Sequence, residues 1–273
     1  MPSYSPTRVA VLIACCAILL ALSGCAGATN YLGRTGPRHA ATASHPTTSN
    51  DGELRVVSFN VKYAKQIDRA IRVLRMDDSL KHPDIVLLQE MDEAGTAAIA
   101  DSLGMNWIYY PASVAHTGKD FGNAILSCWP LDDDTKILLP HQGHLRGNRR
   151  IAVAATARIG GRAFRVYCVH LATLLGNGPL ARRQQLATVL DDAARFPDVI
   201  IGGDFNSETV PDIALDHGYT WPTRHMHRTA SLWTFDHFLL KGVLSARKAR
   251  VGVVRHNLRA SDHHPVWLAV GLR

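Results

Sequence analysis

The pattern of apolar and polar positions divides the 273-residue chain into three parts. Val9–Leu22 is an unbroken apolar run of 14 residues, preceded by a short segment with one positive charge and no acid. Residues 26–52 are rich in small and polar side chains, and from Glu53 onward short apolar runs alternate with amphipathic stretches. The pattern predicts a targeting segment over residues 1–24, a linker over 25–52, and one folded domain over 53–273.

The first apolar run is too short for a stable membrane-spanning helix. As a helix it would extend about 21 Å at ~1.5 Å per residue, whereas the hydrocarbon core of a bilayer is about 30 Å thick. Its length is typical of a secretory signal. The residues that follow, Leu22-Ser23-Gly24-Cys25, resemble the lipobox of bacterial lipoproteins. This resemblance implies cleavage before Cys25, a lipid on its thiol, and an extracytoplasmic, membrane-anchored protein. An ordinary secretory signal and a weak N-terminal anchor are the alternatives.

The linker contains only two large apolar side chains, Tyr31 and Leu32. A segment of this composition cannot bury enough apolar surface to offset its conformational entropy, so we predict a flexible tether. Its 27 residues from Ala26 to Gly52 would have an r.m.s. reach of about 30 Å. The folded domain is therefore expected to stand off the membrane.

The folded part has two kinds of periodicity. Helical spacing of apolar residues predicts helices over 66–80, 93–103, 179–194 and, more briefly, 210–217. Apolar runs predict strands over 54–61, 84–91, 107–110, 123–127, 151–159, 163–171, 198–201, 235–240, 246–254 and 266–272. Strands and helices in both halves predict one α/β or α+β domain, in which two sheets pack face to face and helices flank them.

Composition narrows the class of protein. Apolar residues make up 47% and charged residues 19%, which excludes wholesale disorder. No long apolar run follows the first, which excludes a protein with several membrane spans. The net charge of +7 favours anionic partners, although a merely basic surface would give the same number.

Two cysteines remain in the predicted domain, Cys128 and Cys168. They could form one disulfide in an oxidising compartment. Because both lie in apolar runs, two buried thiols are the favoured interpretation.

Several strand-like runs end in polar residues that could form a catalytic site. In Ile200–Asn206, an apolar run leads through two glycines to Asp204 and Asn206, whose side chains face the same way in an extended chain. An aspartate can accept a proton or bind a metal, whereas an asparagine can hold a phosphate oxygen without adding charge. An Asx turn after a strand is the alternative.

Other strand ends repeat this feature. Glu90 follows the apolar run 85–88, where a buried carboxylate is costly unless it is paired, and a hard divalent cation such as Mg²⁺ would offset that cost. His170 ends the run 164–169 and could face a cleft or cap the sheet. Asp262 and His263 precede the last strand and could be a metal ligand and a proton carrier, or a solvated turn. Asp236 begins a late strand and could fix the tautomer of His263.

In chain order, the segments SFN, QE, GNAILS, VHL, GDFN, FDH and SDHHPV resemble the endonuclease/exonuclease/phosphatase superfamily, from Leu54 to Leu272. The resemblance implies a four-layer α/β/β/α sandwich with the active site at the strand ends of both sheets. It places Asn60 and Glu90 in the metal-binding region and assigns Asp262 to metal or substrate binding. The implied catalytic residues are His170, Asp204, Asn206, Asp236 and His263.

The match to this family is incomplete. Relatives often carry arginine where Cys128 stands, so a charge near the phosphate is expected to be missing. Arg149 and Arg150 could reach the substrate phosphate or could be surface charges. Asn123 opens the GNAILS segment, where the resemblance implies a residue that supports the site, and it is a weaker candidate for a phosphate contact. Abasic-site endonucleases carry tyrosine where His170 stands, which argues against a DNA-repair role.

The resemblance implies a metal-dependent hydrolase of phosphate esters, in which water attacks in line with Mg²⁺, or Mn²⁺ in its place, as cofactor. Either Asp204 or the Asp236–His263 pair would remove the proton from the water. A nuclease is slightly preferred as the function, because of the basic balance and the motif set. The alternatives are a phosphodiesterase or phosphatase acting on phospholipid or glycosyl-phosphoinositide head groups, and an inactive surface binding module. A monomer is expected, and no protein partner is inferred.

Overall fold

The computed structural model describes residues 28–44, 52–144, 147–174, 176–242 and 248–272. The predicted signal and the predicted lipid site at Cys25 lie outside these residues. Among the described residues, none of the helices combines the length and the apolar character that crossing a membrane requires.

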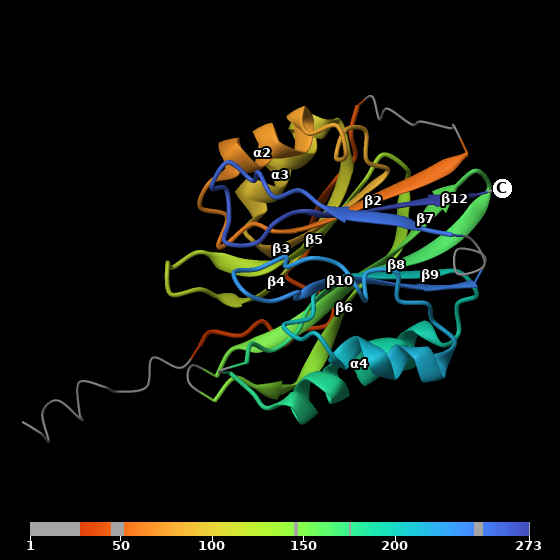
Figure 1. The fold of residues 1–273 in the computed structure, drawn as a ribbon. Helices are drawn as coiled ribbons and strands as arrows, with labels where there is room; N and C mark the ends of the chain where they lie inside the picture. The colour runs from red at the N-terminus through yellow and green to blue at the C-terminus, as the bar shows by residue number, and fades with distance from the viewer. Residues whose placement is uncertain (1–27, 45–51, 145–146, 175, 243–247, 273) are drawn as a thin grey trace, which may run out of the picture.

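Two mixed β-sheets pack face to face between layers of helices (Figure 1). The first sheet has the order β1-β4-β5-β3-β2-β12-β11 and the second the order β10-β9-β8-β7-β6. The strands of the first sheet are β1 (His39–Ala41), β2 (Glu53–Asn60), β3 (Ile85–Met91), β4 (Asn106–Val114), β5 (Asp120–Ser127), β11 (Arg250–Val253) and β12 (Val266–Gly271). Those of the second sheet are β6 (Leu131–Gln142), β7 (Arg149–Ile159), β8 (Arg162–His170), β9 (Val199–Asp204) and β10 (Asp236–Lys241). Only β2–β3 and β8–β9 run parallel among the pairs between these strands.

Helices complete the four layers. Helices α2 (Ile67–Met76) and α3 (Glu93–Leu103) cover the outer face of the first sheet, and α4 (Pro179–Ala193) covers that of the second (Figure 1). A short 3₁₀ helix, η1 (Val210–His217), lies where the brief helix was predicted. The predicted four-layer α/β/β/α sandwich is confirmed.

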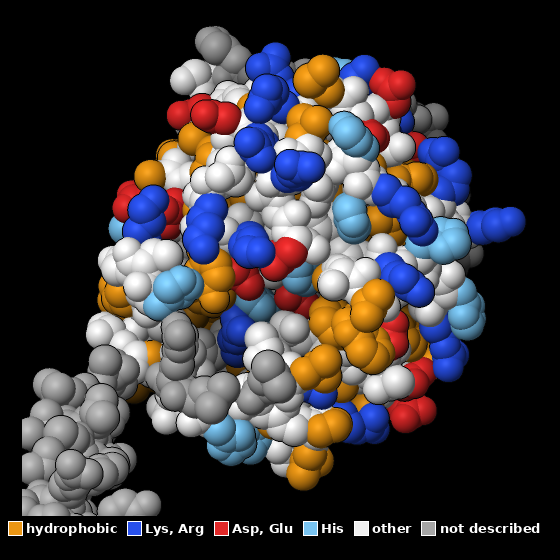
Figure 2. Space-filling view, turned by 60° about the vertical axis from the view of Figure 1, so that its left-hand side comes forward, with side chains coloured by type: hydrophobic (Ala, Val, Ile, Leu, Met, Phe, Trp, Pro, Cys, Tyr) orange, Lys and Arg blue, Asp and Glu red, His pale blue; other side chains and the backbone are white. Residues whose placement is uncertain are grey.

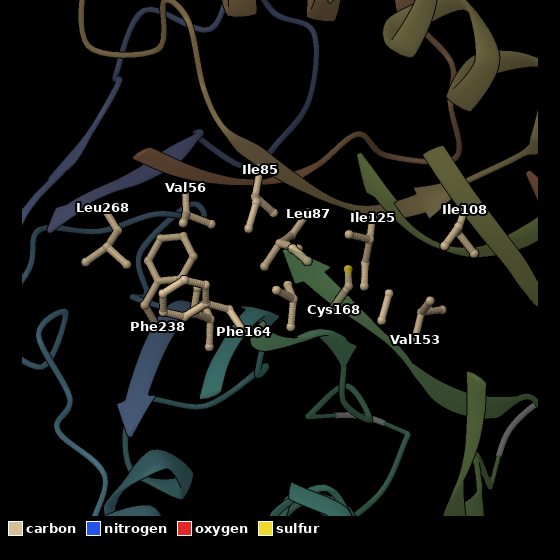
Figure 3. Packing of buried hydrophobic residues seen from close by; sticks show 14 of the residues in the cluster. Val56, Ile85, Leu87, Ile108, Ile125, Val153, Phe164, Cys168, Phe238 and Leu268 are labelled. Atoms are coloured by element: carbon tan, nitrogen blue, oxygen red, sulfur yellow. The ribbon is translucent and has the colours of Figure 1, made fainter. Parts of the chain in front are cut away.

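Alternation along the strands creates separate apolar layers. Val56 faces the space between the sheets, and its neighbour Val57 faces the helices. Figure 3 shows side chains of both sheets meeting in the central layer, among them Leu87, Phe164 and Phe238. This layer holds the two sheets at a fixed separation, so that the ends of their strands meet at one edge.

Several element boundaries differ from those predicted. Helix α2 stops at Met76 rather than at residue 80, because Asp77 adopts an extended backbone. Strand β6 was not predicted, because charged residues interrupt its apolar pattern. It forms the edge of the second sheet, where Asp132 and Asp134 pair with arginines. The two cysteines are free and buried in different apolar layers, in agreement with the favoured interpretation.

The prediction of a flexible tether is wrong for residues 28–44, which we call the strap. Strand β1 of the strap pairs with β4. The buried ammonium of Lys136 donates to the carbonyls of Tyr31 (3.0 Å) and Gly36 (2.8 Å), and Arg38 forms an ion pair with Asp134. The composition argument considered apolar burial alone. The strap is instead held by hydrogen bonds to a strand edge that would otherwise be unpaired.

Candidate active site

Polar side chains from both sheets converge where the strands end. Asp204 ends β9 and is the register partner of His170 on β8 and of Asp236 on β10. Asn60 ends β2 in the facing sheet, and its side chain reaches Asp204. Segments separated by up to about 200 residues in the sequence therefore form one cluster.

Asp204 occupies the centre of this cluster. Its Oδ2 atom accepts a hydrogen bond from Nδ2 of Asn60 at 3.1 Å. The same oxygen lies 3.5 Å from Nε2 of His170 and 3.8 Å from Nε2 of His263. Nδ2 of Asn60 also donates to Oε1 of Glu90 at 3.2 Å, which links the two carboxylates.

Gly203, directly before Asp204, is required by the backbone path. Gly203 has φ +143°, and a Cβ atom there would lie 2.0 Å from the carbonyl oxygen of Val169. After the strand, the N–H of Asn206 donates to Oδ1 of Asp204 at 2.8 Å, and the Asn206 side chain donates to the carbonyl of Leu171 at 3.1 Å. The Asx turn offered as an alternative is thus present, and it orients the central carboxylate.

A β-bulge directs Glu90 to the site. The register of β3 against β5 shifts between Gln89 and Met91, and Glu90 between them has φ +59°, in the left-handed region. Gln89 points between the sheets, where its amide donates to Ser58. The bulge brings the next side chain to the strand ends instead, at a backbone cost of about 1–3 kcal/mol.

The two histidines next to Asp204 differ in charge. Nδ1 of His263 lies 2.9 Å from Oδ2 of Asp236. Burial by itself lowers the pKa of His263, but the negative charges of Asp236 and Asp204 outweigh it and raise the pKa to about 10. His263 is therefore an imidazolium at neutral pH in the metal-free protein, held in place by the Asp236 carboxylate.

His170 is neutral. Nδ1 of its ring lies 3.0 Å from the guanidinium of Arg150. Because arginine can only donate, Nδ1 must be the acceptor, which assigns the proton to Nε2. Burial, and then the positive charge of Arg150, hold the pKa of His170 well below its usual value. His170 therefore presents an N–H donor toward Asp204 and Glu90.

Burial raises the pKa of Asp204 to about 7. The charge of His263 opposes this shift, and the charge of Asp236 adds to it. A carboxyl group with a pKa near neutrality can both take up and release a proton at physiological pH.

The cluster fits a divalent cation. Oε2 of Glu90 is buried and has no hydrogen-bond partner, and a carboxylate oxygen of this kind is the ligand that Mg²⁺ prefers. A second possible ligand set is Asp204, Asp236 and His263, whose ligand atoms lie within 4.8 Å of one another. The hydrogen bond between Asp236 and His263 already occupies two of these three groups. Both oxygens of Asp204 also accept hydrogen bonds, from Asn60 and Asn206, so Glu90 is the best candidate for binding a metal within this cluster.

Some predicted site residues have other partners. Asp262 is half exposed and forms an ion pair with Lys62 at 2.8 Å. Asn123 does not face the substrate side, since it is buried and donates to the carbonyls of Ile151 (3.0 Å) and Cys168 (3.4 Å) in the other sheet. The prediction of a phosphate contact at Asn123 is therefore wrong, because both amide hydrogens join the sheets.

The two arginines also differ. The Arg150 guanidinium reaches His170, whereas Arg149 meets the strap through its backbone N–H, which donates to Asn30 at 2.8 Å. Among the described residues, the cluster has no contact with the side chain of Arg149. The structure therefore does not support the predicted phosphate contact at Arg149. Cys128 is buried, with its sulfur 3.5 Å from the Asp84 carbonyl, and its thiol takes no part in the cluster.

Sequence reasoning missed a cavity beside the cluster. It has a volume of about 690 Å³, and its wall includes Arg150 and the rings of Tyr63, His116 and Phe121. The Phe121 ring centroid lies 5.7 Å from that of His170. Phe121 lies two residues before Asn123 in the same strand. That spacing was the one feature of the sequence from which a ring beside the site could have been expected.

The surface is hollowed at this point. In Figure 2, acidic and histidine side chains gather in a hollow on the face shown, with lysine and arginine side chains around it. A basic rim around an acidic centre attracts an anionic substrate, and the centre has the chemistry to bind a metal and move protons.

Comparison with known proteins agrees with this geometry. The profile of the Endonuclease/Exonuclease/phosphatase family matches residues 57–263. The search of curated proteins found no match.

Solved structures share the fold. An endonuclease/exonuclease/phosphatase from Beutenbergia cavernae is 20% identical, with 81% of this chain and 72% of that chain covered and a TM-score of 0.65. An endonuclease/exonuclease/phosphatase from Bacteroides vulgatus is 15% identical, with 81% and 99% covered and a TM-score of 0.65. D. rerio TDP2, complexed with a single-strand DNA product, is 18% identical, with 80% and 99% covered and a TM-score of 0.65. At these identities the similarity establishes the fold alone.

Proposed function

The chain belongs to the endonuclease/exonuclease/phosphatase family, whose members are metal-dependent phosphoester hydrolases, and from that premise we propose that it is a Mg²⁺-dependent phosphodiesterase exported to a membrane surface. The observation that carries the proposal is the position of Asp204 between a neutral and a charged histidine. This arrangement brings together a proton acceptor (Asp204), a neutral N–H donor (His170) and a positively charged imidazolium (His263).

Each group has a distinct chemical role. Asp204, with its pKa near 7, accepts the proton of the attacking water. His263 as an imidazolium offsets negative charge that develops on the phosphoryl oxygens, and Asp236 holds it in position. His170 donates its Nε2–H to the substrate, and Asn206 orients Asp204 from the other side.

Glu90 would hold the divalent cation, and the Asn60 amide joins it to Asp204. When bound there, such an ion supplies Lewis-acid stabilisation of the phosphoryl group. Asp262 would act from the rim, through its ion pair with Lys62.

The location at a membrane is part of the proposal. It is supported by the apolar run Val9–Leu22 and by the small residues that precede Cys25. In the mature protein a diacylglycerol on Cys25 would retain the domain at a bilayer by burying its acyl chains, at about 0.8 kcal/mol per CH₂ group.

A nuclease is the second candidate. It is favoured by the net charge of +7 and by the likeness in fold to TDP2, which is bound to a single-strand DNA product in its structure. Nuclease activity should fall steeply with salt, because each phosphate contact releases counterions.

The proposal is tested with a panel of substrates. Purified protein is assayed with bis(p-nitrophenyl) phosphate and p-nitrophenyl phosphate, with Mg²⁺, with Mn²⁺ and with EDTA. We expect hydrolysis of the diester, little of the monoester, and loss of activity in EDTA. Equal rates with EDTA would contradict metal dependence, and a preference for the monoester would identify a phosphatase instead.

A further inference from the structure

The strap begins at the wall of the cavity beside the catalytic cluster. Ala28 and Thr29 line that cavity together with Arg150. The N–H of Val114 donates to the carbonyl of Thr29 at 2.8 Å. The side chain of Asn30 is bonded on both sides, to the carbonyl of Gly147 and the N–H of Arg149, each at 2.8 Å. The chain therefore leaves the domain at a fixed point beside the active site.

The predicted lipid site is close to this point along the chain. Cys25 precedes Ala28 by three residues. Three residues span at most about 11 Å at ~3.6 Å each, whatever their conformation. A lipid on Cys25 would thus hold the cavity wall next to the bilayer. The long reach expected for residues 26–52 does not apply, because the strap takes up most of that length on the domain surface.

Apolar side chains are exposed around the same site. Leu232 is 65% exposed and Trp233 is 47% exposed. The Trp233 ring stacks on Phe235, the residue before Asp236, with an interplanar angle of 2°. Their loop is joined to the catalytic residue His263 by the bridge from Ala230. In Figure 2, hydrophobic side chains lie exposed beside the hollow.

A second loop, beside the cavity, also exposes an apolar side chain. Leu174 is 49% exposed and follows Thr173, which lines the cavity. Lysine and arginine side chains also surround the hollow in Figure 2. Apolar side chains and a cation around one face are typical of a surface that rests on anionic lipid.

We propose that this face docks on a membrane and that the substrate phosphodiester belongs to the head group of a membrane lipid. The strap start lies at the cavity wall with Arg150, and the Leu232–Trp233 loop is bridged to His263 through Ala230. These two points of attachment together set which face meets the bilayer. The inference rests on the proposed function, both the phosphodiesterase activity and the lipid on Cys25. A nucleic acid would instead have to enter between the active site and the bilayer.

The docking is tested without reference to catalysis. Leu232→Cys is labelled with an environment-sensitive fluorophore in the lipidated, full-length protein, and Met76→Cys on α2, where Met76 is 69% exposed, is the matched control. In vesicles of phosphatidylcholine with a minor share of phosphatidylglycerol, we expect a blue shift and a several-fold rise in emission at position 232, quenched by spin-labelled lipid, and a water-like signal at 76. A water-like signal at both positions, or equal shifts, would overturn the proposed docking.

The substrate class is tested by moving the domain away from the membrane. A Gly/Ser insert of about 20 residues between Ala26 and Gly27 lowers the effective concentration of the active site at the bilayer. We expect a several-fold slower release of head groups from the vesicles, and no change with soluble bis(p-nitrophenyl) phosphate. The rate of plasmid nicking should not rise when the insert is present.

The outcomes separate this inference from the proposed function. If the soluble diester is hydrolysed but head groups are not released, the lipid substrate is wrong and the phosphodiesterase stands. If head groups are released and the insert leaves the rate unchanged, the docking is wrong and the lipid substrate stands. If plasmid nicking rises when the insert is present, the nuclease is favoured. If the soluble diester is not hydrolysed at all, the proposed function itself fails.

Discussion

His170 and His263 lie 3.5 and 3.8 Å from the same oxygen of Asp204, yet their protonation states are opposite. His170 packs against Arg150 and is neutral, whereas His263 packs against Asp236 and is charged at neutral pH. Both are largely buried, with side chains 2% and 12% exposed. The sign of the partner on Nδ1 therefore decides which histidine donates as a neutral N–H and which supplies positive charge.

The largest expected effect comes from removing the charged histidine. His263→Gln should lower kcat/KM for the soluble diester by about 10³-fold, or ~4 kcal/mol of barrier, because the cation next to the phosphoryl oxygens is lost. His170→Gln retains a neutral N–H donor, so we expect a loss of about tenfold. Steady-state kinetics at saturating Mg²⁺ measures both. Equal losses in the two variants would show that the two histidines do not differ as described.

A smaller effect is expected when the partner of His170 changes. Arg150→Met removes the guanidinium from Nδ1, so the pKa of His170 should rise and the proton should distribute between both ring nitrogens. We expect a loss in kcat/KM of about tenfold. The ¹⁵N chemical shifts of His170 should change from a single Nε2–H tautomer to a mixture.

Arg149→Met is the matched control, because it removes the same charge from the neighbouring residue on β7. It should leave the ¹⁵N signals of His170 unchanged. If both variants alter the tautomer equally, the effect comes from net charge rather than from the contact.

The pH dependence of stability should show the same contrast in metal-free protein. The pKa of Asp204 is raised to about 7 and that of His263 to about 10. Between about pH 6.5 and 10 these two groups bind more protons in the folded state than in the unfolded state, so stability falls as pH rises through that range. Below about pH 6.5 the lowered pKa values of the buried His170 and His237 act in the opposite direction to that of Asp204. The contribution of His263 is fully present below about pH 6.5 and is lost as pH approaches 10.

Urea unfolding in EDTA measures this dependence. Asp204→Asn removes a contribution that falls with rising pH, so stability should rise more steeply between about pH 4 and 6.5 than in the unchanged protein. Asp236→Asn should flatten the curve above about pH 6.5, because His263 then loses its hydrogen-bonded carboxylate. His170 is neutral across the upper range and should contribute nothing there. Stability that rises between pH 7 and 10 would contradict the assignment.

The smallest effect on catalysis is expected at Asn123, which supports the strands that carry Arg150 and His170. Asn123→Ala leaves two backbone carbonyls without their donor and should cost about 1–3 kcal/mol of unfolding free energy. We expect kcat/KM to change less than about threefold, since the side chain does not face the substrate. A large rise in KM with unchanged stability would restore the predicted phosphate contact.

Strongly periodic segments could be predicted well from the sequence. Helix α3 matches its predicted range, and the apolar strands β3, β8 and β9 were found within a few residues. Strand β6 and the strap were missed because their polar side chains and backbone groups pair with distant partners. Periodicity records burial along one segment and carries no information about such pairing.

The candidate site divides in the same way. Asp204 and Asn206 could be predicted as site residues because two glycines and two polar side chains at the end of an apolar strand are destabilising unless they form a site. Arg149 and Arg150 were indistinguishable as neighbours in the chain, and only the contact with His170 separates them. Asn123 was misassigned because a buried asparagine between sheets has the same sequence signal as one at a substrate.

The sequence by itself determined the class of the protein: the alternation of apolar runs encodes the sandwich, and the order of its strand-end residues encodes a phosphoesterase. Only the tertiary structure decided the charge of each histidine, the partner of each arginine and the path of the strap. The physical reason is distance. Burial pattern and backbone preference act over a few neighbouring residues, whereas a pKa or an ion pair depends on groups that folding brings within a few ångströms from remote parts of the chain.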